Sequence, residues 1–240
     1  MIFFSLLSFV FAQTADEIIN KVQEQQAWSE SLLEIDLKID RDGKKDKQYQ
    51  LLTHLKKEQK TLYTHTEFLQ PREVAGTKVI AIDFSEKPDQ LHLFMPTLGR
   101  INTLSTKAKK HTFMGSDLSF EDLDISNYDG AHSILSQDTA SWTIQTLGKK
   151  HPTYSKWISI INKVDHQPTE IQFFDKKDIL IKTMTLTGEA SQGNPFPTKV
   201  DVVDQQHKSH TTFMIKNRSS EISEIPLSLF QKESLIKTKE

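Results

Sequence analysis

Apolar and polar residues alternate along most of the chain, which is the pattern of a β-strand with one buried face. Residues 33–39 read Leu-Glu-Ile-Asp-Leu-Lys-Ile, so every second side chain there is aliphatic. Comparable runs predict strands near residues 33–39, 49–55, 62–68, 79–84, 91–95, 101–104, 110–114, 142–147, 156–161, 170–174, 179–186, 198–203 and 211–215. About a dozen antiparallel strands at this spacing predict a barrel or a strongly curved sheet.

The first residues break the alternation. Residues 2–12 form an apolar run that is shorter than the roughly 20 residues of a membrane-spanning helix. The run ends in Val10-Phe11-Ala12 and is followed by polar residues. This pattern predicts a secretory signal peptide that is cleaved after Ala12.

Residues 14–28 follow a helical pattern instead. Thr14 and Glu17 have the spacing of a capping box, and Ile18, Ile19 and Val22 form an apolar stripe. We predict a helix that packs on the sheet or covers a ligand cavity, and both roles require the same stripe.

Residues 113–123 read Phe-Met-Gly-Ser-Asp-Leu-Ser-Phe-Glu-Asp-Leu, the least generic run in the chain. We interpret it as a strand end, a turn at Gly115 and a helix start capped by Ser119, with acids in the first helical turn. Paired carboxylates can act as acid and base, but no nucleophile, metal-ligand set or phosphate loop accompanies these. We therefore predict structural roles for Asp117, Glu121 and Asp122.

Composition excludes several classes of function. The chain of 240 residues has no cysteine, which excludes disulfides, thiolate metal sites, cysteine nucleophiles and a lipidated cysteine. A formal net charge of −2 provides no basic field for nucleic acid. No glycine-rich nucleotide fingerprint and no G-x-S-x-G serine context occurs, so a nucleotide-binding enzyme or an esterase is not supported.

The nine histidines raise the question of a metal site. His207 and His210 lie close in sequence to Asp201 and Asp204, but residues three apart on a strand point to opposite faces. We therefore predict solvated histidines and no metal. A basic run at residues 107–111 is interpreted as a solvated strand edge, with a docking patch for an acidic partner or a lipid head group as the alternative.

Four short motifs resemble those of the outer-membrane lipoprotein-sorting-like proteins, the superfamily of the LolA carrier. Residues 113–123 resemble the F-M-G-[ST]-D-[FL]-[ST]-[YF]-E-D-L signature of that family, and residues 68–77 resemble its P-x-[DE]-V-x-G-T loop. Residues 93–100 resemble its L-Y-x-P-x-L-x-R strand and turn, and residues 197–199 its late P-T-K hairpin. The motif residues, which we predict to be structural, are Pro71, Gly76, Thr77, Pro96, Arg100, Phe113, Met114, Gly115, Asp117, Glu121, Asp122 and Leu123.

The resemblance implies a mainly β (α+β) fold, an incomplete antiparallel barrel in which a curved sheet of about 11 strands is covered by short helices. This single domain would span residues 13–240. It further implies a soluble periplasmic carrier, not an enzyme and without a cofactor, that binds lipidated protein or other lipid-like cargo in a hydrophobic cavity. The side chains predicted to line that cavity are Ile35, Leu37, Leu51, Leu93, Met95 and Trp157.

The implied process is outer-membrane lipoprotein sorting or envelope lipid transport. The predicted partners are a lipid or an acylated protein as cargo and an inner-membrane transporter, and the chain is predicted to be a monomer that does not bind nucleic acid. The alternative is a non-enzymatic accessory module of a membrane transporter or envelope complex that acts through protein contacts alone.

Overall fold

A computed structural model describes residues 13–25, 30–59, 61–84, 88–104, 112–119, 122, 130–148, 151, 153–188, 197–219 and 224–236. Within these residues a single antiparallel sheet of 13 strands dominates the molecule. The strands are β1 (Glu30–Arg41), β2 (Lys47–Glu58), β3 (Thr61–Gln70), β4 (Lys78–Asp83), β5 (Gln90–Met95), β6 (Arg100–Leu104), β7 (Ala131–Gln137), β8 (Ser141–Leu147), β9 (Lys156–Asn162), β10 (Pro168–Phe174), β11 (Leu180–Thr187), β12 (Lys199–Asp204) and β13 (Ser209–Ser219). The helical elements are α1 (Ala15–Gln25) and the short 3-10 helices η1 (Pro96–Leu98), η3 (Phe113–Gly115), η4 (Leu227–Phe230) and η5 (Lys232–Leu235).

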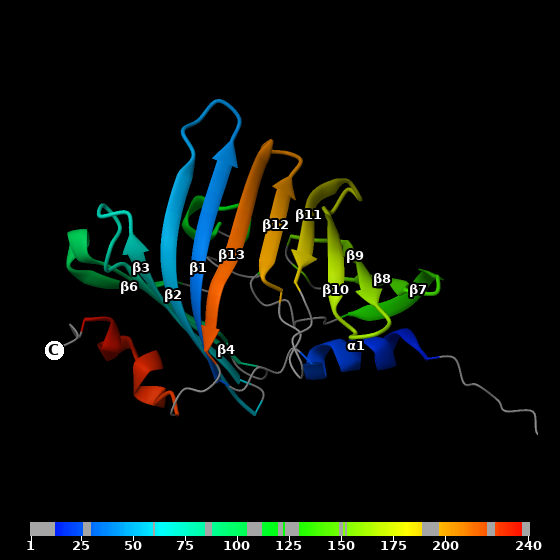
Figure 1. Cartoon of the computed structure of the whole chain (residues 1–240), viewed down its shortest axis with the longest axis horizontal. Helices are drawn as coiled ribbons and strands as arrows, with labels where there is room; N and C mark the ends of the chain where they lie inside the picture. The colour runs from blue at the N-terminus through cyan, green and yellow to red at the C-terminus, as the bar shows by residue number, and fades with distance from the viewer. Residues whose placement is uncertain are drawn as a thin grey trace, which may run out of the picture.

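The chain enters the sheet at β1, next to the middle strand β13. It runs outward from β1 to the edge strand β6, crosses to the opposite edge at β7, and returns strand by strand to β13 beside β1. Leu37 of β1 is thereby paired with Phe213 of β13, although these strands lie at opposite ends of the chain. The edge strands β6 and β7 are not paired with each other, so the sheet stays open and strongly curved (Figure 1).

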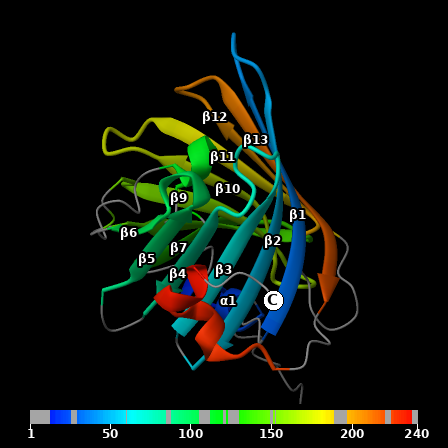
Figure 2. The ribbon, with the colours of Figure 1, turned by 90° about the vertical axis from the view of Figure 1, so that its left-hand side faces the viewer.

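The two faces of the sheet carry different covers. The inner face packs against α1 and the segment around η3, which are enclosed by the curved strands (Figures 1 and 2). The outer face of β3 to β5 packs against η4 and η5, which are drawn in red in Figure 2. None of the described helices is both long and apolar enough to cross a membrane.

Helix α1 begins as its sequence predicts. The Thr14 N–H donates to Glu17 Oε2 at 2.9 Å, and the Glu17 N–H donates to Thr14 Oγ1 at 3.3 Å, which is a reciprocal capping box. Ile18, Ile19 and Val22 are buried against the sheet. The structure ends α1 at Gln25, and the predicted continuation through residue 28 lies outside the described residues.

The predicted β-rich architecture is confirmed, with two corrections. The strand predicted at residues 110–114 is wrong, because residues 113–115 form η3, where Gly115 reverses the chain at a φ of +79°. The edge strand β7 was not predicted, because Ala-His-Ser-Ile-Leu-Ser-Gln lacks a clear alternation. An edge strand with few buried side chains needs no such pattern.

Candidate functional site

The inner face of the sheet carries one continuous apolar cluster. It joins strands from both halves of the sheet to α1 and to the segment around η3. Five of the six predicted cavity residues lie in this cluster or pack against it, namely Ile35, Leu37, Leu51, Leu93 and Trp157. The sixth, Met95, alternates with Leu91 and Leu93 on the same face of β5 and is half-buried.

Residues 112–119 and 122, called the motif segment below, lie on this inner face. Thr112 and Ser119 form an isolated antiparallel bridge, and the Phe113 N–H donates to the Leu118 carbonyl at 2.7 Å. Phe113 and Leu118 are both buried in the apolar cluster. The positive φ of Gly115 confirms the turn predicted there, since this region favours glycine.

Two buried hydroxyls anchor the middle of the motif segment to β13. Ser209 Oγ donates to the Asp117 carboxylate, and Thr211 Oγ1 donates to the other carboxylate oxygen at 2.7 Å. The Asp117 N–H in turn donates to Thr211 Oγ1 at 2.9 Å. Arg41 of β1 adds a hydrogen bond to the Gly115 carbonyl at 2.8 Å. Through these contacts Asp117 holds the motif segment against β13, which is a structural role.

Asp122 takes part in a second buried cluster, made of Asp122, Tyr154 and Lys182 and called the inner clasp below. Lys182 Nζ donates to Asp122 Oδ2 at 2.5 Å, and the Tyr154 hydroxyl donates to Asp122 Oδ1 at 2.7 Å. Lys182 Nζ also donates to the Tyr154 hydroxyl at 2.9 Å. The side chains of Lys182 and Asp122 are only 7% and 1% exposed. This is a desolvated ion pair at the border of an apolar face.

Ser119 closes the end of the motif segment as the cap prediction requires. Its N–H donates to Asp122 Oδ2 at 2.7 Å, and the Asp122 N–H donates to Ser119 Oγ at 3.2 Å. This reciprocal pair is the start of a capped turn. Glu121 and Leu123 lie outside the described residues, as does the side chain of Met114.

The remaining motif residues meet at one end of β3 to β6. Gly76, at a φ of +78°, approaches Pro96 so closely that a Cβ on Gly76 would lie 3.1 Å from Pro96 Cγ. Pro71 opens the same loop, Thr77 is buried, and Arg100 begins β6 with an exposed side chain. The two loops therefore support each other, away from the inner clasp.

Sequence reasoning missed Lys182 and Tyr154. Lys182 precedes Met184 and Leu186 at the inward positions of β11, so a lysine interrupting an apolar alternation was the available signal. Tyr154 lies before β9 in a stretch with no periodic pattern, so its sequence gave no signal.

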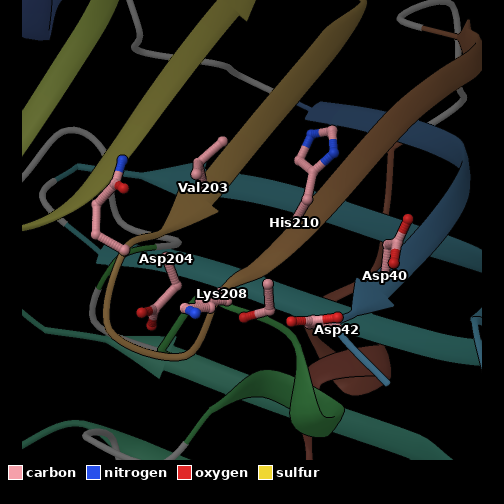
Figure 3. Close-up of a pocket in the computed structure, with 8 residues that line it drawn as sticks. Asp40, Asp42, Val203, Asp204, Lys208 and His210 are labelled. Carbon is pink, nitrogen blue, oxygen red and sulfur yellow. The ribbon is translucent and has the colours of Figure 1, made fainter. Parts of the chain in front are cut away.

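Two recesses lie along the sheet, and the larger of the two reaches Leu37 and Tyr49 of the apolar cluster. One, of about 630 Å³, is lined largely by polar side chains of β1, β2, β12 and β13, including Lys38, Gln50 and Lys216. The other, of about 420 Å³, lies between the end of β1 and the β12–β13 hairpin (Figure 3). Charged and amide residues make up most of each lining, which does not suit an acyl chain.

The second recess includes Asp204 and His210, two of the four residues that raised the metal question. His207 Nδ1 lies 2.9 Å from Asp204 Oδ2, whereas His210 Nε2 lies 3.0 Å from Asp201 Oδ1, so the four residues form two separate pairs. Burial raises the pKa of Asp201, but hydrogen bonds from Lys199, Thr212 and His210 lower it by more. The pKa of Asp201 therefore lies below its ordinary value. In the described part of the chain, no group of three or more ligating side chains is placed to hold a metal ion.

A protein-family model with the description "uncharacterized protein-like" matches residues 57–237. The chain belongs to this family. A search of curated protein sequences gives no match.

Solved structures show what the fold of this family member resembles. A DUF1329 family protein from Desulfovibrio piger superposes with a TM-score of 0.84 at 21% identity, covering 93% of this chain and 100% of that chain. A domain assigned by name to outer membrane lipoprotein sorting, from Vibrio parahaemolyticus, gives a TM-score of 0.80 at 20% identity with the same coverages of 93% and 100%. A LolA superfamily protein from Nitrosomonas europaea gives 0.72 at 16% identity, again with 93% and 100% covered. The fold is therefore LolA-like, as the sequence motifs predicted.

Proposed function

We propose that this chain is a soluble periplasmic carrier that binds lipidated protein or other lipid-like cargo on the inner apolar face of its curved sheet. The observation that carries the proposal is the apolar cluster that runs across this face from both halves of the sheet. A large continuous apolar surface in a protein must be covered by the chain itself, by a partner or by a ligand. Here α1 and the motif segment supply the chain's own cover.

The cover at α1 is thin enough for cargo to replace it. Ile18, Ile19 and Val22 are the large aliphatic side chains that this helix buries. Burying three such side chains contributes roughly 5–9 kcal/mol, and an acyl chain of about ten CH₂ groups contributes roughly 8 kcal/mol. Exchange of one for the other therefore costs little net free energy, which is the condition for uptake and release.

The periplasmic part of the proposal rests on the predicted signal peptide at residues 2–12. The non-enzymatic part is supported by the contacts of Asp117, Asp122 and their partners, which fasten the motif segment to the sheet. A solved structure named for the LolA superfamily shares the fold, and we take the carrier role from that likeness.

Binding of a fluorescent fatty-acyl probe to residues 13–240 tests the proposal. The Leu93→Glu and Met95→Glu variants should weaken probe binding without unfolding the protein, since both side chains lie on the inner face of β5. Phe94→Glu is the matched control, because Phe94 is also half-buried on β5 but packs against the outer cluster. Absence of probe binding at tens of micromolar protein would overturn the carrier proposal and favour an accessory module acting through protein contacts.

Movement of α1 can be followed separately. Because the chain has no cysteine, Lys21→Cys creates a unique labelling site on the exposed side of α1. An environment-sensitive dye at this position should change its emission when acyl cargo binds. An unchanged signal at saturating cargo would show that α1 stays in place and that cargo enters elsewhere.

A further inference from the structure

The inner clasp places a buried cation beside the aromatic rings of the inner apolar cluster. Lys182 follows the inward alternation of Met184 and Leu186 on β11, and it pairs across the strands with Phe173. Its ammonium group lies 5.6 Å from the ring centre of Tyr154 and 5.8 Å from that of Phe173. Tyr154, Phe173, Met184 and Leu186 all belong to the inner apolar cluster.

The two donors of the clasp are held independently of the acid that they bind. The Tyr154 ring lies between His151 and Phe173, at centroid distances of 4.7 and 4.8 Å. The backbone of Tyr154 is fixed by the His151 ring and by Lys176, whose Nζ donates to the Tyr154 carbonyl at 2.7 Å. Lys182 is fixed by the sheet. Removing Asp122 would therefore leave an ammonium and a hydroxyl in place, both directed to one site.

An unpaired ammonium at that place would be unstable. A buried charge that loses its partner is strongly disfavoured, whereas a charged group paired through short hydrogen bonds is tolerated. Asp204 is the cross-strand neighbour of Lys182, but its carboxylate accepts hydrogen bonds from the His207 and Gln206 N–H groups and contacts the His207 ring. Cargo that displaces the motif segment from Lys182 must consequently bring an anion of its own.

We propose that Lys182 and Tyr154 form the head-group site of the carrier, and that the cargo is an amphiphile with an acyl chain and an anionic oxygen head such as a carboxylate or a phosphate. In the structure, the Asp122 carboxylate occupies the position of that head group. Cargo binding exchanges one oxyanion for another on the same two donors, while the acyl chain enters the apolar cluster. This inference rests on the proposed carrier function and adds the charge of the cargo to it.

Three amphiphiles of equal chain length distinguish the contribution of the head group to binding from that of the acyl chain. Dodecanoate and dodecyl phosphate should displace a neutral fluorescent acyl probe from residues 13–240 at concentrations about tenfold lower than dodecanol does. Acetate and inorganic phosphate, which lack the chain, should not displace it. Displacement by these ions alone would identify a site for free anions and overturn the assignment of an acyl cargo.

Variants of the clasp test whether Lys182 causes the preference. Asp122→Asn removes the competing carboxylate and should increase the preference for dodecanoate over dodecanol several-fold. The double variant Asp122→Asn with Lys182→Met removes both charges together and should reduce the preference to none. The matched control is Glu30→Gln with Lys56→Met, which removes the buried lysine pair on the outer face and should leave the preference unchanged.

The outcomes distinguish this inference from the proposed function. Equal displacement by all three amphiphiles in the unmodified chain would overturn the anionic head-group site and leave the carrier function standing. If the preference for dodecanoate over dodecanol persists in the double variant Asp122→Asn with Lys182→Met, the clasp only fastens the motif segment and is not a head-group site. Failure of the chain to bind any acyl probe would overturn both proposals.

Discussion

The described part of the molecule contains two buried lysine clasps, and they differ in what they hold. On the outer face, Lys56 Nζ donates to Glu30 Oε1 at 2.8 Å and to the Ile225 carbonyl at 2.9 Å, and the Ile225 N–H donates to Glu30 Oε2 at 2.7 Å. We call these three residues the outer clasp. The inner clasp instead joins three side chains to one another, and the one backbone group described as donating to its carboxylate is the Ser119 N–H of the motif segment itself.

The difference indicates two kinds of task. The outer clasp satisfies both backbone groups of Ile225, so it fastens the C-terminal segment that carries η4 and η5 over the outer cluster. In the inner clasp the donors on the sheet side are the side chains of Lys182 and Tyr154, so another oxyanion can take the place of Asp122 without breaking a strand, at the cost of the hydrogen bond from the Ser119 N–H that caps the motif segment. Lys56 and Glu30 are 4% and 22% exposed, so water reaches the acid of the outer clasp more readily than that of the inner clasp.

The largest expected effect comes from removing one partner of the inner clasp. Lys182→Met alone leaves the Asp122 carboxylate buried without its cation, which should lower the free energy of unfolding by about 3–5 kcal/mol. Urea denaturation of the purified chain measures this loss. The double variant with Asp122→Asn should recover most of it, and Lys56→Met should cost less than Lys182→Met because Glu30 keeps contact with water. An equal loss in both single variants would remove the contrast between the clasps.

A smaller loss of stability is expected from substitutions at Gly115, in the turn that precedes Asp117 and Asp122. At the positive φ of Gly115, a β-branched residue is strained even though no atom lies within 4 Å of the added Cβ. Gly115→Val should therefore destabilise the chain by about 1–3 kcal/mol, and Gly115→Ala by less. The C-terminal segment at residues 224–236 contains no glycine, so it has no equivalent position. An unchanged melting temperature for Gly115→Val would contradict the structural interpretation of the motif.

Acid should loosen the outer region before any carboxylate is protonated. Burial lowers the pKa of His92 under η5, Lys232 lowers it further, and Glu233 partly opposes both. A histidine whose folded pKa lies below its ordinary value of about 6.5 contributes stability above that pH and loses it as the pH falls through this value. The melting temperature should therefore drop from about pH 7.5 to about pH 5.5, and by less in His92→Gln.

His166 is a second histidine whose pKa is lowered in the folded protein. Burial lowers its pKa first, Lys21 of α1 lowers it further, and Asp165 opposes the change. Combining His92→Gln with His166→Gln should flatten the same pH interval more than either substitution alone. An equal acid response in the double variant would show that other groups cause it.

The smallest effect should come from an exposed pair on the same sheet. Lys216 Nζ lies 3.3 Å from Asp36 Oδ2, with side chains 56% and 43% exposed. Lys216→Ala should change the free energy of unfolding by no more than about 0.5 kcal/mol, because water screens such pairs and replaces them readily. A loss comparable to that of Lys182→Met would mean that burial does not explain the difference between the ion pairs.

The strands, the helix cap and the turn could be predicted because each of them depends on residues that lie close together in the sequence. The alternation in residues 33–39 produced β1, the Thr14–Glu17 spacing produced the cap of α1, and Gly115 produced the turn of the motif segment. The family motifs predicted the LolA-like fold. The structure places five of the six predicted cavity residues in or against the inner apolar cluster, and binding of cargo there remains a prediction.

Only the tertiary structure shows on which face of the sheet a charged side chain such as that of Lys182 lies. Period-two alternation says that Lys182 shares a face with Met184, but not that this face is the inner one or that a residue 60 positions away would meet it there. The return of the chain from β7 to β13 brings β11 beneath the motif segment and so joins Asp122 to Lys182 and Tyr154. Such contacts depend on strand order and curvature, which are set by the packing of the whole sheet, and no short stretch of sequence contains them.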